Sequence, residues 1–359
     1  MKILDRYILK QFIKPFLFAV VSFAGIIVIA TIFEHLKTIL KNKVSLSASF
    51  QFFSCIIPSV LIQVAPIASL LGAIFCINQL SKNKELIIMK ASGINIKKII
   101  LPILSASVII SIFVFFADEI AVPYYAKKAE LIKLVEIDKK TPESLYQNIS
   151  FKSFNKYFQI KLYDSRSKEI QGIQIIEQAL DKSVLSRIDA ATGTWQKRNL
   201  DYEWTLSNVM IRRFNKQGEI KTIENLKNKK IYLMYSPEEF SEINPETMNI
   251  VSLADHISSL KETGYYPRDK YVDLLQKVAF PMASFFVTFL GIPFALRSKR
   301  SGAATGFGIS IIIAFIYWTS MSIFLAWGKA GIINPYFAPF MPNSICLLLG
   351  LYLLQKTRT

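Results

Sequence analysis

Two groups of long apolar runs constrain the fold of this chain more than any other feature. Runs of about 20 apolar residues have the length that an α-helix needs to cross the hydrocarbon core of a bilayer. With 52% hydrophobic residues and a mean hydropathy of +0.34, the composition excludes a single soluble domain. The sequence therefore predicts an α-helical polytopic membrane protein with six spans, three in each half, at residues 16–33, 50–80, 99–117, 278–296, 303–327 and 337–354.

About 150 residues without such a run separate the two groups. Within them, residues 157–163 alternate apolar and polar, which is typical of a half-buried strand, and residues 164–168 indicate a turn. Short strands with such turns favour an antiparallel sandwich or open roll. The predicted domains are 1–121, 122–270 and 271–359, and further strands are expected at 172–177, 184–190 and 204–214.

The basic surplus lies beside the apolar runs. Residues 122–270 hold 24 of the 43 basic and 20 of the 26 acidic residues, so most of the net charge of +17 flanks the spans. This distribution fits positive cytoplasmic loops and makes nucleic acid a poor explanation of the high pI. It predicts cytoplasmic N- and C-termini, basic inner loops at 82–98 and 297–300, and an extracytoplasmic insert, although the first outer loop is also basic.

A short segment between the second and third spans predicts a surface helix at about residues 83–93. Asn83 can cap it, Glu85 lies in its first turn, and Gly93 can end it in a left-handed conformation. At about 15 Å the helix is too short to cross a bilayer, yet residues 86–89 form an apolar block that needs cover. Both a helix resting on lipid headgroups and a helix docking to a partner fit this pattern.

Catalytic motifs are missing from the sequence. It has no phosphate-binding loop, no zinc-protease motif, no nucleophile elbow, and only two distant histidines, His35 and His256. Cys55, Cys76 and Cys346 fall in apolar runs, where no disulfide is expected. No catalytic, metal or cofactor-binding residue is predicted, although a Ser–Lys protease dyad remains open because its spacing is not diagnostic.

Charged residues near the ends of the spans are candidates for a lipid path, because charge facing lipid tails is costly. Glu34 and Lys37 lie at the end of the first span, Asp118 and Glu119 at the end of the third, and Lys277 at the start of the fourth. The alternatives are that these side chains reach the headgroup region or pair with one another.

Small residues recur four apart on the fifth span. Gly302 and Gly306 form one such pair, and Ala304 and Gly308 form another. This spacing lets a second helix approach closely, either within the chain or from a partner subunit.

The chain carries a series of short motifs in a fixed order, at residues 4–8, 85–93, 119–123, 277–281, 293–295, 342–343 and 350–354. Taken together, they resemble those of the lipopolysaccharide export permeases LptF and LptG, and the resemblance covers essentially the whole chain. The start at 4–7 and the Ala-Ser-Gly at 91–93 are more similar to LptG. The sequence departs from the LptG pattern at the end of the first span, where Thr31 and Glu34 precede the first basic residue.

The resemblance implies a Gram-negative inner-membrane permease subunit that is not itself an enzyme. Its expected partners are an LptF-like permease in a heterodimer, two copies of an LptB-like ATPase that binds ATP and Mg²⁺, and a single-helix LptC-like protein. The insert would be a periplasmic β-jellyroll. The segment at 83–93 would be the coupling helix that enters the ATPase, with Glu85, Leu86, Ile88, Met89, Ser92 and Gly93 as its contacts.

The leading hypothesis is therefore ATP-driven extraction of lipopolysaccharide from the outer leaflet of the inner membrane. Glu34, Lys37, Lys41 and Lys277 are the predicted lipid-path residues, with the lysines attracting phosphates.

The alternative is a membrane-anchored periplasmic scaffold or lipid-binding protein without an ATPase, although six spans exceed what a tether needs. An ion-coupled transporter would need paired acidic residues at mid-membrane and related halves, which are not visible. Lipoprotein release systems differ by their four-helix topology.

Overall fold

The structure is a computed structural model of the 359-residue chain. It describes residues 3–138, 145–153, 156–164, 167–179, 184–198, 201–215, 219–233, 245–262, 266–297 and 303–356. The chain divides into two compact units. The helical unit comprises Met1–Ile132, Pro245–Ile250 and Arg268–Thr359, and the β unit comprises Lys133–Asn244 and Val251–Pro267.

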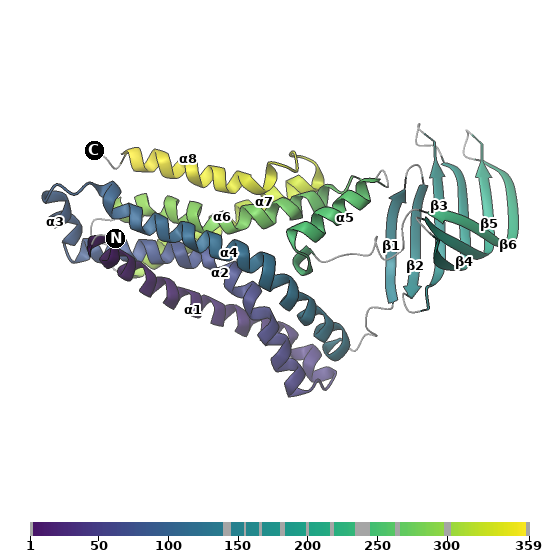
Figure 1. Cartoon of the computed structure of the whole chain (residues 1–359), viewed down its shortest axis with the longest axis horizontal. Coiled ribbons are helices and arrows are strands. Elements are labelled where there is room, and N and C mark those ends of the chain that lie inside the picture. The colour runs from purple at the N-terminus through teal and green to yellow at the C-terminus, as the bar shows by residue number, and fades with distance from the viewer. Residues whose placement is uncertain are drawn as a thin grey trace. The chain divides into compact units, whose positions relative to one another are not determined.

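Six helices in the described part of the chain are long and apolar enough to cross a membrane, which confirms the predicted number of spans. The helices are α1 (Ile3–Lys41), α2 (Leu46–Lys82), α4 (Ile96–Ile132), α6 (Arg268–Arg297), α7 (Ala303–Ala330) and α8 (Met341–Lys356), and Figure 1 shows their arrangement. Helices α1, α2, α4 and α6 extend beyond their predicted spans at both ends, and α7 extends beyond its span at the C-terminal end only. Helix α8 begins at residue 341, four residues after the predicted start, and ends two residues after the predicted end.

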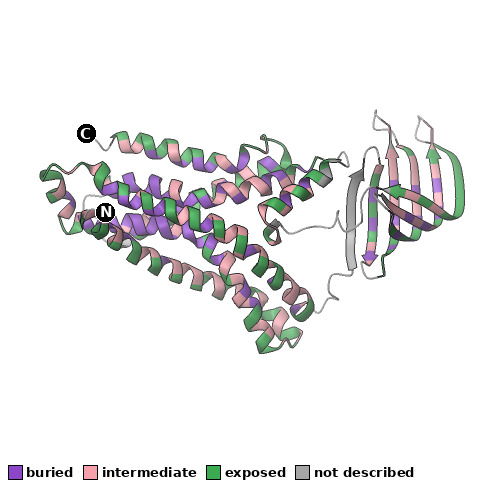
Figure 2. Cartoon of the chain, in the orientation of Figure 1, coloured by how far each residue is buried: buried purple, intermediate pink, exposed green. Residues whose placement is uncertain are grey.

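Helices α2 and α6 form the centre of the helical unit. Their apolar windows are 78% and 61% buried, whereas that of α1 is 6% buried, and Figure 2 shows the buried positions concentrated on the central helices. Ser69 of α2 and Thr288 of α6 share a buried hydrogen bond of 2.8 Å. Gly291 of α6 lets the two helices approach closely, because a side chain there would overlap Leu70.

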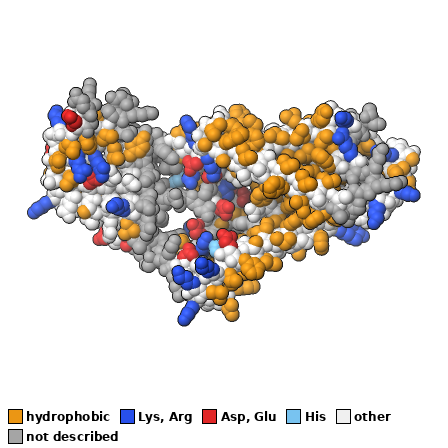
Figure 3. Space-filling view, turned by 180° about the vertical axis from the view of Figure 1, so that it is seen from behind, with side chains coloured by type: hydrophobic (Ala, Val, Ile, Leu, Met, Phe, Trp, Pro, Cys, Tyr) orange, Lys and Arg blue, Asp and Glu red, His pale blue; other side chains and the backbone are white. Residues whose placement is uncertain are grey.

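The outer surface of the helical unit is largely apolar. On α1, Phe18 and Val21 are 73% and 72% exposed, and hydrophobic side chains cover much of the helical face in Figure 3. A surface of this kind is stable against lipid tails or another membrane helix but not against water. The outer helices therefore expose the surface expected of membrane spans.

Shorter helices join the long ones. They are α3 (Glu85–Ala91), the π-helix η1 (Lys133–Ile137), the 3₁₀ helices η3 (Pro245–Thr247) and η4 (Ala338–Phe340), and α5 (Ile250–Glu262), which the sequence analysis did not predict. The start of α1 and the end of α8 lie at the same end of the helical unit as α3 (Figure 1).

The described strands of the β unit form one antiparallel sheet of six strands, in the order β1-β2-β3-β4-β5-β6. Each strand pairs with the next along the chain, so these strands form a meander. A β domain between the two groups of spans is confirmed, although its unit also contains most of α5, and strands β1 and β6 were not predicted. The strands are β1 (Leu145–Ser153), β2 (Lys156–Asp164), β3 (Glu169–Gln178), β4 (Val184–Arg198), β5 (Asp201–Phe214) and β6 (Ile220–Leu233).

The two faces of the sheet differ in chemistry because successive side chains of a strand alternate between them. One face carries the apolar cluster, in which Trp204 and Phe158 pack with ring centroids 6.4 Å apart. Trp195 donates a buried hydrogen bond of 3.0 Å to the Tyr163 hydroxyl. The opposite face carries polar and charged side chains such as Gln174.

Candidate functional site

Helix α3 is the short surface helix that the sequence predicts, with seven residues. The prediction that Asn83 caps it was wrong: Lys84, with φ of +60°, precedes the helix and no side chain caps it. The Asn83 amide instead donates to Glu85 Oε1 over 3.0 Å. Gly93 has φ of +79°, the left-handed conformation expected of it.

The carboxylate of Glu85 is held from two directions. The Tyr7 hydroxyl of α1 donates to Glu85 Oε2 over 2.8 Å, while Asn83 holds Oε1. Gln11 in turn donates to the Tyr7 oxygen over 3.2 Å. The two neutral donors, Tyr7 and Asn83, therefore fix the orientation of the Glu85 carboxylate.

The apolar block of α3 divides into an inner and an outer pair. Leu86 is 6% exposed and, with Met89, packs into the main core of the helical unit. Ile87 and Ile88 are each 62% exposed. Leu86 and Met89 therefore attach the helix to the bundle, and Ile87, which the predicted contact set omitted, forms the outward apolar surface with Ile88.

Ser92 and Gly93 follow α3 and are exposed. The backbone N–H of Ser92 bonds to the Ile88 carbonyl over 2.9 Å, and that of Gly93 bonds to Lys90 over 3.0 Å. These bonds close the last turn, so both residues shape the end of the helix and remain exposed there.

Lys277 is paired inside the helical unit. Its Nζ lies 3.8 Å from Asp118 Oδ2, and the side chains are 9% and 19% exposed. The pair joins α6 to α4. Among the alternatives from the sequence, the structure places Lys277 in a pair of charges, not as an isolated cation.

The other predicted lipid-path residues lie on α1. Glu34, Lys37 and Lys41 are exposed, and within the described part of the chain none of them forms an ion pair. The aromatic contact between His35 and Phe52, with ring centroids 5.3 Å apart, joins this part of α1 to α2. The structure therefore does not bring these three residues together with Lys277.

Two further carboxylates on the long helices have clear partners. Both oxygens of Glu119 accept the backbone N–H of Ile250 at 2.9 Å, which places a negative charge at the first residue of α5. Asp273 of α6 pairs with Lys329 of α7 over 2.6 Å. Sequence reasoning missed this second pair because its members are 56 residues apart and neither lies in a motif.

The predicted small-residue positions have different surroundings. Gly306 lies against α2, and a Cβ on it would come within 2.5 Å of Asn78 Nδ2. A Cβ on Gly308 would meet nothing within 4 Å, and Gly302 lies outside the described residues. Gly306 is thus an internal packing position, whereas Gly308 lies on the open side of α7.

Among the described residues, no group of three or more histidine, cysteine or acidic side chains is placed to hold a metal ion. Cys55, Cys76 and Cys346 are buried free thiols. The polar side chains of the helical unit are therefore best understood through packing, pairing and surface contacts.

The architecture defines a class, a polytopic helical membrane protein with a β domain inserted between two groups of three spans. Comparison with known families then identifies it: residues 6–356 match the model of the lipopolysaccharide export system permease LptF/LptG, and the chain belongs to this family.

Individual relatives are similar over their full length. The LptG permease protein of Haemophilus influenzae is 21% identical over 360 residues, covering 99% of both chains. The LptG of Escherichia coli K12 is 22% identical over 365 residues, covering 99% of this chain and 98% of the relative. The family resemblance seen in the sequence is confirmed.

Proposed function

We propose that this chain is the LptG-like permease subunit of an ATP-driven exporter that extracts lipopolysaccharide from the outer leaflet of the inner membrane. In this proposal α3 and both chain ends are cytoplasmic, the β unit is periplasmic, and lipid passes from the spans to a periplasmic bridge. The proposal rests on family membership and on one observation, the outward surface of α3.

That surface combines a fixed charge with exposed apolar area. Glu85 is oriented by Tyr7 and Asn83, and Ile87 and Ile88 stand exposed beside it on a helix too short to span a membrane. An apolar and acidic helix surface of this kind fits a groove on a partner protein. In the proposed complex the groove belongs to an LptB-like ATPase, which binds ATP and Mg²⁺, while this chain performs no catalysis.

The other proposed partners follow from the family. An LptF-like permease would face the exposed apolar helices of this chain, and an LptC-like single helix would lie beside α1, the least buried span. Glu34, Lys37 and Lys41 remain the proposed headgroup contacts on α1, because they are exposed. Lys277 of α6 would contact a headgroup only if its ion pair with Asp118 opens.

Co-expression with the candidate permease and ATPase tests the proposal. We would purify through a tag on this chain, reconstitute the complex in proteoliposomes and measure ATP-dependent release of lipopolysaccharide to a periplasmic acceptor. We expect stoichiometric co-purification and release. A stable chain that recruits no ATPase would support the scaffold alternative instead.

The variant Glu85→Lys then examines coupling. It reverses the charge that Tyr7 and Asn83 hold in place, so we expect the chain to fold while release per ATP hydrolysed falls severalfold. The matched control is Lys43→Glu, a charge reversal at an exposed position beyond the other end of α1. Unchanged release in Glu85→Lys would remove α3 from the coupling mechanism.

A further inference from the structure

The polar face of the β sheet contains a cleft of about 540 Å³. Strands β2 to β5 contribute to it, and its charged side chains are three cations and one carboxylate: Lys161, Arg187, Arg212 and Asp189. Cationic side chains therefore predominate in the cleft, on the face opposite the apolar cluster.

Small residues on the central strands form the floor of this cleft. Gly172 of β3 and Ala191 of β4 line it between longer side chains of β2 and β5. A Cβ on Gly172 would come within 2.9 Å of the Lys161 side chain, so the lysine stem lies directly against the glycine. The hollow thus follows from side-chain size on neighbouring strands.

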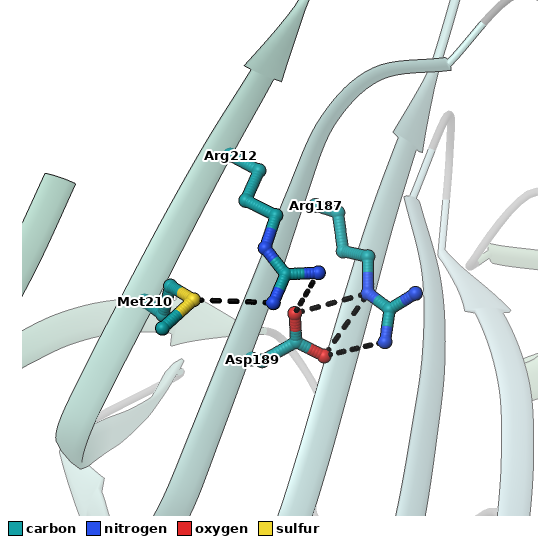
Figure 4. Close-up of polar contacts among 4 residues, drawn as sticks. All are labelled: Arg187, Asp189, Met210 and Arg212. Atoms are coloured by element: carbon teal, nitrogen blue, oxygen red, sulfur yellow. Dashed lines mark hydrogen bonds and ion pairs between the residues drawn. The ribbon is translucent and has the colours of Figure 1, made fainter. Parts of the chain in front are cut away.

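The two arginines have different partners, as Figure 4 shows. Arg187 donates to Asp189 through Nε at 3.0 Å and through Nη2 at 2.9 Å. When the Gln174 amide is oriented with its oxygen toward Arg187, it also accepts from Nε at 2.9 Å. The donors of Arg187 are therefore largely used within the protein.

Arg212 lacks an equally strong acceptor. Its Nη2 donates to the thioether sulfur of Met210 at 3.2 Å, and its Nη1 lies 3.9 Å from Asp189 Oδ2. Thioether sulfur is a weak acceptor, whereas a guanidinium carries five N–H donors. Since the Arg212 side chain is only 33% exposed, water reaches these donors incompletely, and the site favours an additional anionic acceptor.

We propose that this cleft binds a phosphate group, either free or carried by a sugar. Arg212 would supply the forked donors that match phosphate geometry, and Lys161 would add positive charge from β2. Gln159 and Asn208 line the same cleft and can hydrogen-bond sugar hydroxyls. Asp189 orients Arg187 and limits the site to anions that can compete with its carboxylate.

The test uses the full chain in zwitterionic nanodiscs without any ATPase, so its result is independent of the proposed transport function. The probes are inorganic phosphate and glucosamine 6-phosphate, titrated by calorimetry at low salt, with glucosamine as the uncharged control. Binding of either phosphate probe supports the site, and competition between them identifies free phosphate or the phosphosugar as the preferred ligand. Binding of neither overturns the proposal.

Two substitutions of adjacent arginines separate a local site from general charge. Arg212→Gln should weaken binding about tenfold, the effect of losing a charge-assisted bidentate contact. Arg213→Gln removes the same charge from the next position of β5, where the side chain is 58% exposed and pairs with Glu224 at 3.6 Å. This control should change affinity by less than about twofold, and equal losses in both variants would overturn the site.

Asp189→Asn distinguishes binding from a purely structural ion network. Removing the competing carboxylate should tighten phosphate binding severalfold, because Arg187 and Arg212 then lack an anionic partner. A structural network alone predicts lower thermal stability with no gain in affinity. That second outcome would contradict the proposed role of the cleft.

Discussion

The Tyr7 hydroxyl donates a hydrogen bond to Glu85 Oε2 over 2.8 Å and so joins α1 to α3 across 78 positions of sequence. Both residues belong to motifs that resemble the family, one at the start of the chain and one in the loop after α2. The structure gives these distant motifs one shared role. The start of α1 orients the carboxylate of the proposed coupling helix.

Tyr7→Phe removes this hydrogen bond and keeps the ring. We expect a loss of stability of about 0.5–1.5 kcal/mol, the usual contribution of one such bond, with a larger relative loss of release per ATP hydrolysed because Glu85 is no longer oriented. Thermal unfolding and the proteoliposome assay measure the two effects. Tyr336→Phe is the matched control, since Tyr336 is an exposed tyrosine elsewhere in the helical unit, and equal release from both variants would contradict the positioning role.

The outer pair of α3 should act in docking and the inner pair in stability. Ile87→Ser with Ile88→Ser changes side chains that are 62% exposed, so we expect normal unfolding temperature and loss of ATPase co-purification. Leu86→Ala removes a buried side chain and should lower the free energy of unfolding by about 2–4 kcal/mol. Quantitative co-purification and thermal unfolding check both expectations. Retained ATPase binding by the serine variant would show that the exposed surface is not the dock.

The pair of Lys277 and Asp118 can be tested by breaking it from one side. Lys277→Met removes the cation that lies 3.8 Å from Asp118 and leaves that carboxylate, whose side chain is 19% exposed, without its partner. We expect the free energy of unfolding to fall by about 3–5 kcal/mol. Lys41→Met is the control because it changes an exposed lysine. Its free energy of unfolding should stay within about 0.5 kcal/mol of that of the parent protein.

Adding Asp118→Asn to Lys277→Met should recover much of the lost stability, because the carboxylate left without its cation is then also removed. Thermal unfolding of the parent, Lys277→Met, Asp118→Asn and the double variant in one detergent gives the coupling free energy between the two side chains. Additive losses in the double variant would show that the two side chains do not depend on each other.

The sequence predicts the parts of the fold that depend on local pattern. Spans follow from apolar length, and strands such as β2 follow from alternation. Strand β6 escapes prediction because it is exposed at most positions and carries Lys221, Lys227, Lys229 and Lys230 among its apolar residues, so no half-buried alternation identifies it. Helix α5 was missed within the long polar insert, where no span-length signal exists.

Contacts between distant segments could not be predicted in the same way. The residue type of Glu85 suggested a surface role, but its bond to Tyr7 depends on how α1 and α3 pack. Likewise, Lys277 was visible as a charge at membrane depth, while its partner among several acidic residues required the packing of α4 against α6. The cleft around Arg212 depends on which residues share one sheet face across four strands.

The two glycines of α7 provide a matched test of packing. Gly306→Ala and Gly308→Ala gain the same helix propensity, about 1 kcal/mol, but their surroundings differ. At Gly306 the new methyl would lie 2.5 Å from Asn78 Nδ2, and Asn78 is only 7% exposed. Displacing the Asn78 amide should lower the free energy of unfolding by about 1–3 kcal/mol.

Gly308→Ala meets nothing within 4 Å and should be neutral or stabilising in the isolated chain. Thermal unfolding of both variants in the same detergent gives the difference directly. Equal stability would mean that α7 moves away from α2 without penalty, and the packing of Gly306 against Asn78 would not restrain that helix. Reduced co-purification of the partner permease by Gly308→Leu alone would place the open side of α7 at the interface between subunits.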